Sequence, residues 1–144
     1  MAETFDMIDG EKLLGHYTVV VLEQMAHGWQ PTVMPLSAVV TNYRLVLKPY
    51  KKKYDPATLP SHFIKRVELT KRGRLNCIEL RFRSMQSLFL MLSTGKLDDL
   101  YHDLSAMITP PPRFHFDEKV AQEDIKRLVS FLENQRATLN SLSE

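Results

Sequence analysis

Apolar and polar residues alternate with a period of two across much of residues 16–92, which predicts a series of short β-strands. The alternation is clearest in LNCIELRFR, where Ile78, Leu80 and Phe82 fall on one side and polar residues fall on the other. Leu88 and Leu90 continue an apolar face in SLFLML. Strands are predicted within residues 16–25, 36–42, 43–49, 61–69, 75–83 and 87–92.

The period changes to 3.6 at Leu97, which predicts an amphipathic helix that ends before the three consecutive prolines starting at Pro110. Ser93 or Thr94 is available as its N-cap, and acidic residues in the first turn suit the helix dipole. The expected buried face consists of Leu97, Leu100, Tyr101, Leu104, Met107 and Ile108. We expect the inward residues of the strands and of this helix to share one core.

A second helix is predicted from Asp117, which serves as its N-cap, to about residue 140. Its apolar stripe consists of Ile125, Leu128, Val129, Leu132 and, less regularly, Leu139. The predicted fold class is α+β: a split antiparallel β-barrel of six to seven strands capped by an α-helix, plus an additional C-terminal helix. The expected division is residues 1–110 for the barrel domain and 111–144 for a proline-containing linker and the C-terminal helix.

Composition places the chain among ordinary globular proteins, with 44% hydrophobic and 25% charged residues. The only cysteine is Cys77, so neither an intrachain disulfide nor a cysteine-only metal site is possible. This usage suits a reducing compartment. The sequence has no signal-peptide pattern and no apolar run long enough to span a membrane. We therefore expect a cytoplasmic protein, with peripheral attachment to an intracellular membrane as the alternative.

Charge is distributed unevenly along the chain, although the formal net charge is only +2. Residues 41–83 hold a net charge of +9, whereas residues 1–40 and 97–144 carry −4 each. The candidate anionic-ligand or membrane face consists of Lys48, Lys51, Lys52, Lys53, Lys71, Arg72 and Arg74. These residues either gather at one barrel end to attract an anionic headgroup, or form solvated turns that keep strand edges soluble.

Short motifs in the strand region resemble the GRAM-type branch of the pleckstrin-homology (PH-like) superfamily. The first motif is a strand of small apolar residues that ends in Thr41-Asn42, and the second is the start of the next strand with Tyr43-Arg44-Leu45. Pro60, Ile64, Val67 and Glu68 complete the pattern. The resemblance covers about residues 11–108. It implies a seven-stranded barrel capped by a helix, with the seventh strand near residues 28–34 or within 61–69. It also implies a non-catalytic domain that binds phosphoinositides or proteins. Lipid sites of such domains commonly draw on the first hairpin, whereas the lysine cluster here follows the next strand.

Other chemistries have little support in the sequence. The aromatic residues near the lysines, Tyr43, Tyr50 and Tyr54, could stack on bases, but no nucleic-acid motif accompanies them. The five histidines have no metal-binding spacing, and no GxSxG, P-loop or GxGxxG motif is present. We expect no catalysis, no cofactor and no metal, and we regard nucleic acid as a poor candidate partner.

The preferred interpretation is a non-enzymatic adaptor that mediates protein–protein interaction, and the alternative is a domain that binds phosphoinositides or anionic membranes. A candidate partner-helix face lies in the C-terminal segment and consists of Phe114, Phe116, Ile125, Leu128, Val129 and Leu132. An apolar stripe of this kind must find a surface, because burying each side chain stabilises by about 1.5–3 kcal/mol. The sequence leaves open whether that surface is the barrel or another chain.

Overall fold

A computed structural model describes residues 7–26, 28–32, 34–50, 54–93, 95–111 and 117–143 of the chain. Side chains of the last helix are described as far as residue 134. Six residues singled out from the sequence lie outside the described residues: Lys51, Lys52, Lys53, Thr94, Phe114 and Phe116.

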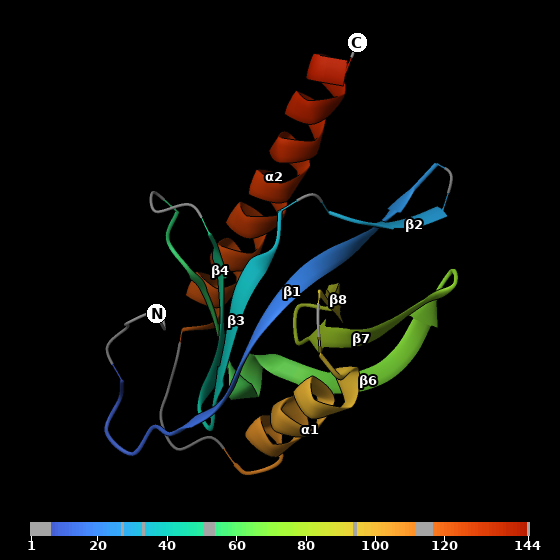
Figure 1. Cartoon of the computed structure of the whole chain (residues 1–144). Helices are drawn as coiled ribbons and strands as arrows, with labels where there is room; N and C mark the ends of the chain where they lie inside the picture. The colour runs from blue at the N-terminus through green and yellow to red at the C-terminus, as the bar shows by residue number, and fades with distance from the viewer. Residues whose placement is uncertain are drawn as a thin grey trace.

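The described residues form one sheet of eight antiparallel strands and two α-helices (Figure 1). The strands are β1 (Leu13–Met25), β2 (Gly28–Pro31), β3 (Leu36–Thr41), β4 (Arg44–Pro49), β5 (Ala57–Pro60), β6 (Ile64–Arg72), β7 (Leu75–Phe82) and β8 (Ser87–Leu92). Their order is β5-β4-β3-β1-β8-β7-β6, and β2 pairs with β1 outside this path. The sheet curls without closing, because β5 and β6 at its two ends are not hydrogen-bonded to each other. This confirms the predicted fold class.

The strand prediction was right for the alternating segments and incomplete elsewhere. The expected strand near residues 28–34 is β2, but β5 was not predicted and brings the number of strands to eight rather than six or seven. Strand β5 has only four residues, which are too few for an alternating pattern to be recognised. The expected core is confirmed, since seven side chains named in advance belong to one buried cluster: Ile78, Leu80, Phe82, Leu88, Leu90, Leu100 and Leu104.

Helix α1 (Leu97–Ile108) covers one end of the curled sheet, where it packs on β6, β1, β3 and β7. The Tyr17 hydroxyl donates a hydrogen bond to the Asp103 carboxylate and ties the helix to β1. Burial and this contact raise the pKa of Tyr17 well above its ordinary value. The predicted cap was wrong: the N-cap is Lys96, which makes no side-chain capping bond, and Ser93 lies outside the helix.

Helix α2 (Glu118–Ser143) follows the proline segment, and its upper part extends beyond the strands in Figure 1. Asp117 accepts a hydrogen bond from the Lys119 backbone N–H at 2.9 Å, as expected of the predicted N-cap. Five apolar side chains of α2 join the barrel core: Ala121, Ile125, Leu128, Phe131 and Leu132. The stripe predicted from the sequence therefore rests on the chain's own barrel.

Polar contacts hold α2 against the outer strand β5. The Asp124 carboxylate accepts a hydrogen bond from the Thr58 N–H at 3.0 Å, and Arg127 donates to the carbonyl oxygen of Pro56 at 3.1 Å. The rings of Tyr54 and Phe131 lie 4.0 Å apart between their centroids. In this way α2 covers a strand edge that would otherwise be open to pairing with another chain.

Candidate functional site: a groove at the barrel mouth

The basic residues singled out from the sequence do not form one cluster in the described part of the chain. Lys48 lies near the end of β4, whereas Lys71, Arg72 and Arg74 lie at the β6–β7 turn. Four strands separate β4 from β6 in the sheet, and the two places lie far apart in Figure 1. The structure therefore brings Lys71, Arg72 and Arg74 together but not Lys48.

Arg72 is engaged in contacts within the fold. Its guanidinium carbon lies 4.6 Å from the centre of the Phe89 ring and 5.7 Å from that of Trp29, at cation–π distance. The two rings meet edge to face with centroids 5.0 Å apart. A guanidinium nitrogen of Arg72 also lies 3.4 Å from a carboxylate oxygen of Glu79. Arg72 therefore joins the β1–β2 hairpin to the second half of the barrel.

Glu79 is a buried carboxylate on the outer side of β7. It accepts hydrogen bonds from the Ser87 hydroxyl at 2.8 Å and from Arg81 at 3.2 Å. Burial raises the pKa of the Glu79 carboxyl, but these hydrogen bonds and the charges of Arg81 and Arg72 outweigh burial and hold it below the usual value. Glu79 is thus a fixed anion within this face of the sheet.

Arg44, one of the residues that carry the family resemblance, has a similar structural role at the β3–β4 turn. It makes a two-pronged ion pair with the buried Glu11, at 2.9 Å and 3.0 Å, and the Thr41 hydroxyl donates to the same carboxylate at 2.6 Å. Burial raises the pKa of Glu11, but the bonds from Arg44, Thr41 and the Ile8 N–H lower it below its usual value. The Thr-Asn-Tyr-Arg motif therefore fixes a hairpin to the N-terminal segment.

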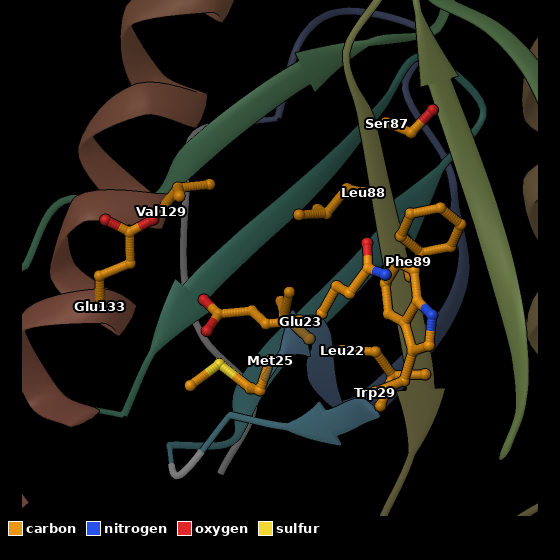
Figure 2. Close-up of a pocket in the computed structure, with 11 residues that line it drawn as sticks. Leu22, Glu23, Met25, Trp29, Ser87, Leu88, Phe89, Val129 and Glu133 are labelled. Atoms are coloured by element: carbon orange, nitrogen blue, oxygen red, sulfur yellow. The ribbon is translucent and has the colours of Figure 1, made fainter. Parts of the chain in front are cut away.

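A groove opens where β1 and β8 separate. The ladder between them ends at the pair Leu22–Phe89, although β1 continues to Met25 and β8 begins already at Ser87. Helix α2 passes beside this fork (Figure 2). We call the space the barrel-mouth groove. Its first cavity, of about 480 Å³, is lined by Val21, Leu22, Glu23, Gln24, Met25, Trp29, Ser87, Leu88, Phe89, Val129 and Glu133.

A second cavity of about 530 Å³ adjoins the first and shares the wall formed by Ser87, Leu88, Val129 and Glu133. Figure 2 shows Leu88 and Val129 directed toward the space between the sheet and α2, with Glu23 and Glu133 on its two sides. Among the described residues that line the first cavity there is no Lys, Arg or His. The second cavity has one cation, Lys126. The groove thus combines apolar walls with an acidic mouth.

Among the described residues of the predicted partner-helix face, Val129 alone lines both cavities. Ile125 lines the second cavity, while Leu128 and Leu132 are buried in the core. Sequence reasoning missed the remaining groove residues. Glu23 offered a signal, because it continues the inward alternation of Val19 and Val21 with an acid instead of an apolar residue.

Within the described residues, no three or more His, Cys, Asp or Glu side chains are grouped so as to hold a metal ion. Among the helices of the described ranges, none combines the length and apolar character that crossing a membrane requires.

Comparison with protein-family models gives no match, and neither does comparison with curated proteins. Solved structures do match. One is the C-terminal domain of an unknown protein from Leishmania infantum, which is 18% identical, with 71% of this chain and 88% of that chain covered and a TM-score of 0.55. At this identity the likeness shows the fold alone. Another is the hSac2 domain from human phosphoinositide phosphatase Sac2, which is 13% identical, with 70% of each chain covered and a TM-score of 0.47.

Proposed function

We propose that the chain is a non-enzymatic adaptor module of the GRAM type, which binds a protein partner at the barrel-mouth groove. The observation that carries this proposal is a groove with apolar walls and an acidic mouth, set between α2 and the fork of β1 and β8. Cavities of about 300–1,000 Å³ are typical of ligand sites in proteins. The motifs around Thr41–Leu45, the strand order and the capping helix support the GRAM-type assignment.

The charges favour a protein over an anionic membrane as the ligand. Among the described residues that line the first cavity, none is a cation that could bind an anionic headgroup. Outside the groove, Arg72 is already paired with Glu79, and four strands separate β4, with Lys48, from β6. Scattered cations give only weak, salt-sensitive attraction to a membrane surface.

The state of the only thiol supports a binding role rather than catalysis. Cys77 is fully buried on β7. Burial raises the pKa of the Cys77 thiol, with Glu79 adding to the rise and Arg72 opposing it. A buried thiol with a raised pKa is a poor nucleophile.

The test compares a variant that blocks the groove with two controls. Val129→Arg places a long cation in the wall shared by both cavities. Gln122→Arg makes the same charge change on α2 at a residue outside the lining of both. Lys71→Glu with Arg74→Glu alters the exposed basic turn. Circular dichroism and thermal melting first establish that each variant is folded. Each is then used in quantitative pull-down from cell extract and in sedimentation with vesicles containing phosphatidylserine or phosphoinositides.

We expect proteins that are captured by wild type, by Gln122→Arg and by the basic-turn variant, but not by folded Val129→Arg. We also expect no vesicle binding at physiological salt. Capture that is insensitive to Val129→Arg would contradict the proposal. So would vesicle binding that is lost in the basic-turn variant and kept in Val129→Arg, because that result assigns the function to the basic turn and to lipid.

A further inference from the structure

We propose that the outer edge of β6 takes an extended peptide segment that carries a glutamate or aspartate two positions before an apolar residue. This contact surface is separate from the barrel-mouth groove, so it adds a second docking site to the adaptor proposed above. Three features of the described chain carry the inference: the unpaired edge of β6, a cavity beside that edge, and the cations around the cavity.

The two ends of the sheet differ in how their edges are covered. Strand β5 ends the strand order on one side, where the Asp124 carboxylate of α2 accepts a hydrogen bond from the Thr58 N–H at 3.0 Å. Strand β6 ends the order on the other side, and within the described residues β7 is the only strand that pairs with it (Figure 1). An unpaired strand presents main-chain donors and acceptors that another strand can use. The edge of β6 therefore has the groups that an added strand requires.

The β6–β7 hairpin shows which main-chain groups of β6 point outward. Arg72 and Leu75 face each other across a two-residue turn, and a hydrogen bond between these flanking residues closes such a turn. Bonded and non-bonded pairs alternate along an antiparallel ladder, so Val67, Leu69 and Lys71 turn their N–H and C=O groups away from β7. The Lys71 carbonyl oxygen accepts a hydrogen bond from the Arg72 guanidinium at 2.8 Å. Among the described residues, no hydrogen bond from an element other than β7 reaches the main chain of Val67 or Leu69.

A cavity of about 390 Å³ lies beside this edge, between the β6–β7 hairpin and the start of α1. Leu69 is 41% exposed, although Val67 on the same side of the strand is buried in the core. A strand added at the edge places every second side chain on this side, next to Leu69. An apolar side chain at that position would cover Leu69 and reach the cavity. The lining consists of Leu69, Thr70, Asn76, Lys96, Leu97 and Asp98.

Cations lie around the same cavity. Lys71 is two positions after Leu69 and so shares its side of β6, and Lys96 belongs to the lining. Among the described residues, neither of these two ammonium groups has a carboxylate partner. Asp98, the acid of the described lining, lies in the first turn of α1, where it offsets the helix dipole. An acidic side chain opposite Lys71 would therefore meet two cations.

The charges favour a foreign segment over a second copy of β6 as the occupant. Strand β6 carries four basic residues and one acid, Glu68, which is itself paired with Arg66 at 3.3 Å. Two copies would bring cations face to face, and like charges directly opposite each other destabilise a strand pair. Antiparallel pairing is the more stable kind. In an antiparallel segment the residue opposite Lys71 comes two positions before the residue opposite Leu69, which gives the pattern Glu-x-Leu.

The experiment measures binding of labelled nine-residue peptides to the full chain by fluorescence anisotropy. The peptides are rich in β-branched residues and carry a central Glu-x-Leu, with Gln-x-Leu and Lys-x-Leu as matched controls. A fourth peptide repeats Glu-x-Leu with a methyl group on the backbone nitrogen of its leucine, which faces β6 in the added strand. Its control is methylated on the nitrogen of x, which faces away from β6. Amide hydrogen exchange followed by NMR reports where the peptide lies.

Two pairs of protein variants test the edge and its charge, after circular dichroism has shown that each is folded. Leu69→Pro removes the outward N–H, and an edge strand tolerates proline where the N–H faces away from the sheet. Leu69→Ala is its control, because it shortens the same side chain and keeps the N–H. Lys71→Glu reverses the charge beside the cavity. Lys119→Glu makes the same change at an exposed residue of α2.

We expect Glu-x-Leu to bind about tenfold more tightly than Lys-x-Leu, with Gln-x-Leu between them. Added salt and Lys71→Glu should each reduce this preference, whereas Lys119→Glu should leave it unchanged. Leu69→Pro and methylation of the leucine nitrogen should abolish binding, but Leu69→Ala and methylation of x should not. Bound Glu-x-Leu should slow the exchange of the Val67 and Leu69 N–H groups.

Equal binding of the three peptides, a preference for Lys-x-Leu, or equal effects of the two methylations would overturn this inference. Failure of every peptide to bind, or slowed exchange elsewhere but not at β6, would overturn it too. So would a concentration-dependent dimer in analytical ultracentrifugation that Leu69→Pro dissolves, because a second copy would then be the occupant. The proposed function is judged separately. Protein capture that depends on Val129 survives each of these results, and capture that ignores Val129 removes the proposed function without affecting peptide binding at β6.

Discussion

Helices α1 and α2 both pack on the barrel, but they leave different surfaces behind. Helix α1 seals its end of the curled sheet: Leu100 and Leu104 are fully buried, and the Tyr17–Asp103 hydrogen bond fixes the helix to β1. Helix α2 buries an equally continuous stripe, but its next face, with Val129, looks into two cavities beside β8. An amphipathic helix packed on an open sheet therefore covers the core at α1 and leaves a groove at α2.

The difference lies in the strands that each helix meets. Helix α1 packs on β6, β1, β3 and β7 at its end of the sheet, whereas β1 and β8 separate beside α2. The two cavities next to α2 border this separation. Binding surfaces are commonly found at such places, because residues there are freed from the demands of core packing.

The largest effect is expected from removing α2 altogether. Deleting residues 117–144 exposes the core surface under Ile125, Leu128 and Leu132, each of which contributes about 1.5–3 kcal/mol when buried. The sum approaches the whole free energy of unfolding of a typical domain, about 5–15 kcal/mol. We expect thermal melting monitored by circular dichroism to lose its cooperativity. An unchanged melting temperature would show that α2 is a detachable docking element rather than part of the barrel domain.

A smaller effect should distinguish the sealed end from the groove. Leu104→Ala creates a cavity in a fully buried site and should lower the free energy of unfolding by about 2–5 kcal/mol. Val129→Ala trims a half-buried wall that already borders open space, so its cost should be about 1 kcal/mol or less. Urea denaturation measures both. Equal costs would mean that the groove is packed as tightly as the core and would remove the contrast between the two ends.

The smallest effect concerns the turn at the rim of the groove. Met85 lies in the β7–β8 turn with φ of 70°, a left-handed conformation that favours glycine, and its side chain is 65% exposed. The backbone needs no side chain at this position, so Met85→Gly should raise the free energy of unfolding by about 0.5–1 kcal/mol. Gln86→Gly, at the next residue, should lower it. Destabilisation by Met85→Gly in urea titration would show that the methionine packs in the folded chain.

Elements with a strong local pattern of apolar residues were predicted correctly from the sequence, and elements with a weak pattern were missed. The alternation of Ile78, Leu80 and Phe82 and the 3.6-residue spacing of Leu100 and Leu104 predicted the core correctly, because each element must bury one face whatever its neighbours are. Strand β5 was missed because it is short, and its edge is covered by Asp124 of α2, far along the chain. A local pattern does not encode a partner 66 residues away.

The candidate site depended much less on local pattern. Charge runs along the sequence suggested one basic face, but the topology placed four strands between β4, with Lys48, and β6, with Arg72. It also paired Arg72 with Glu79 and with the ring of Phe89. Position along the chain says how charged a segment is. Pairing across the sheet decides which charges meet and which are already neutralised.

The sequence by itself determined the α+β class, the core-facing residues and the two helices, because the periods of two and 3.6 follow from backbone geometry alone. Only the tertiary structure decided that α2 packs on its own barrel and that Glu23, Leu88, Val129 and Glu133 line one groove. These residues come from three elements that meet where β1 and β8 separate. The reason is physical: a groove is the space that packing leaves unfilled, and that space exists only after the sheet has curled and the helix has docked.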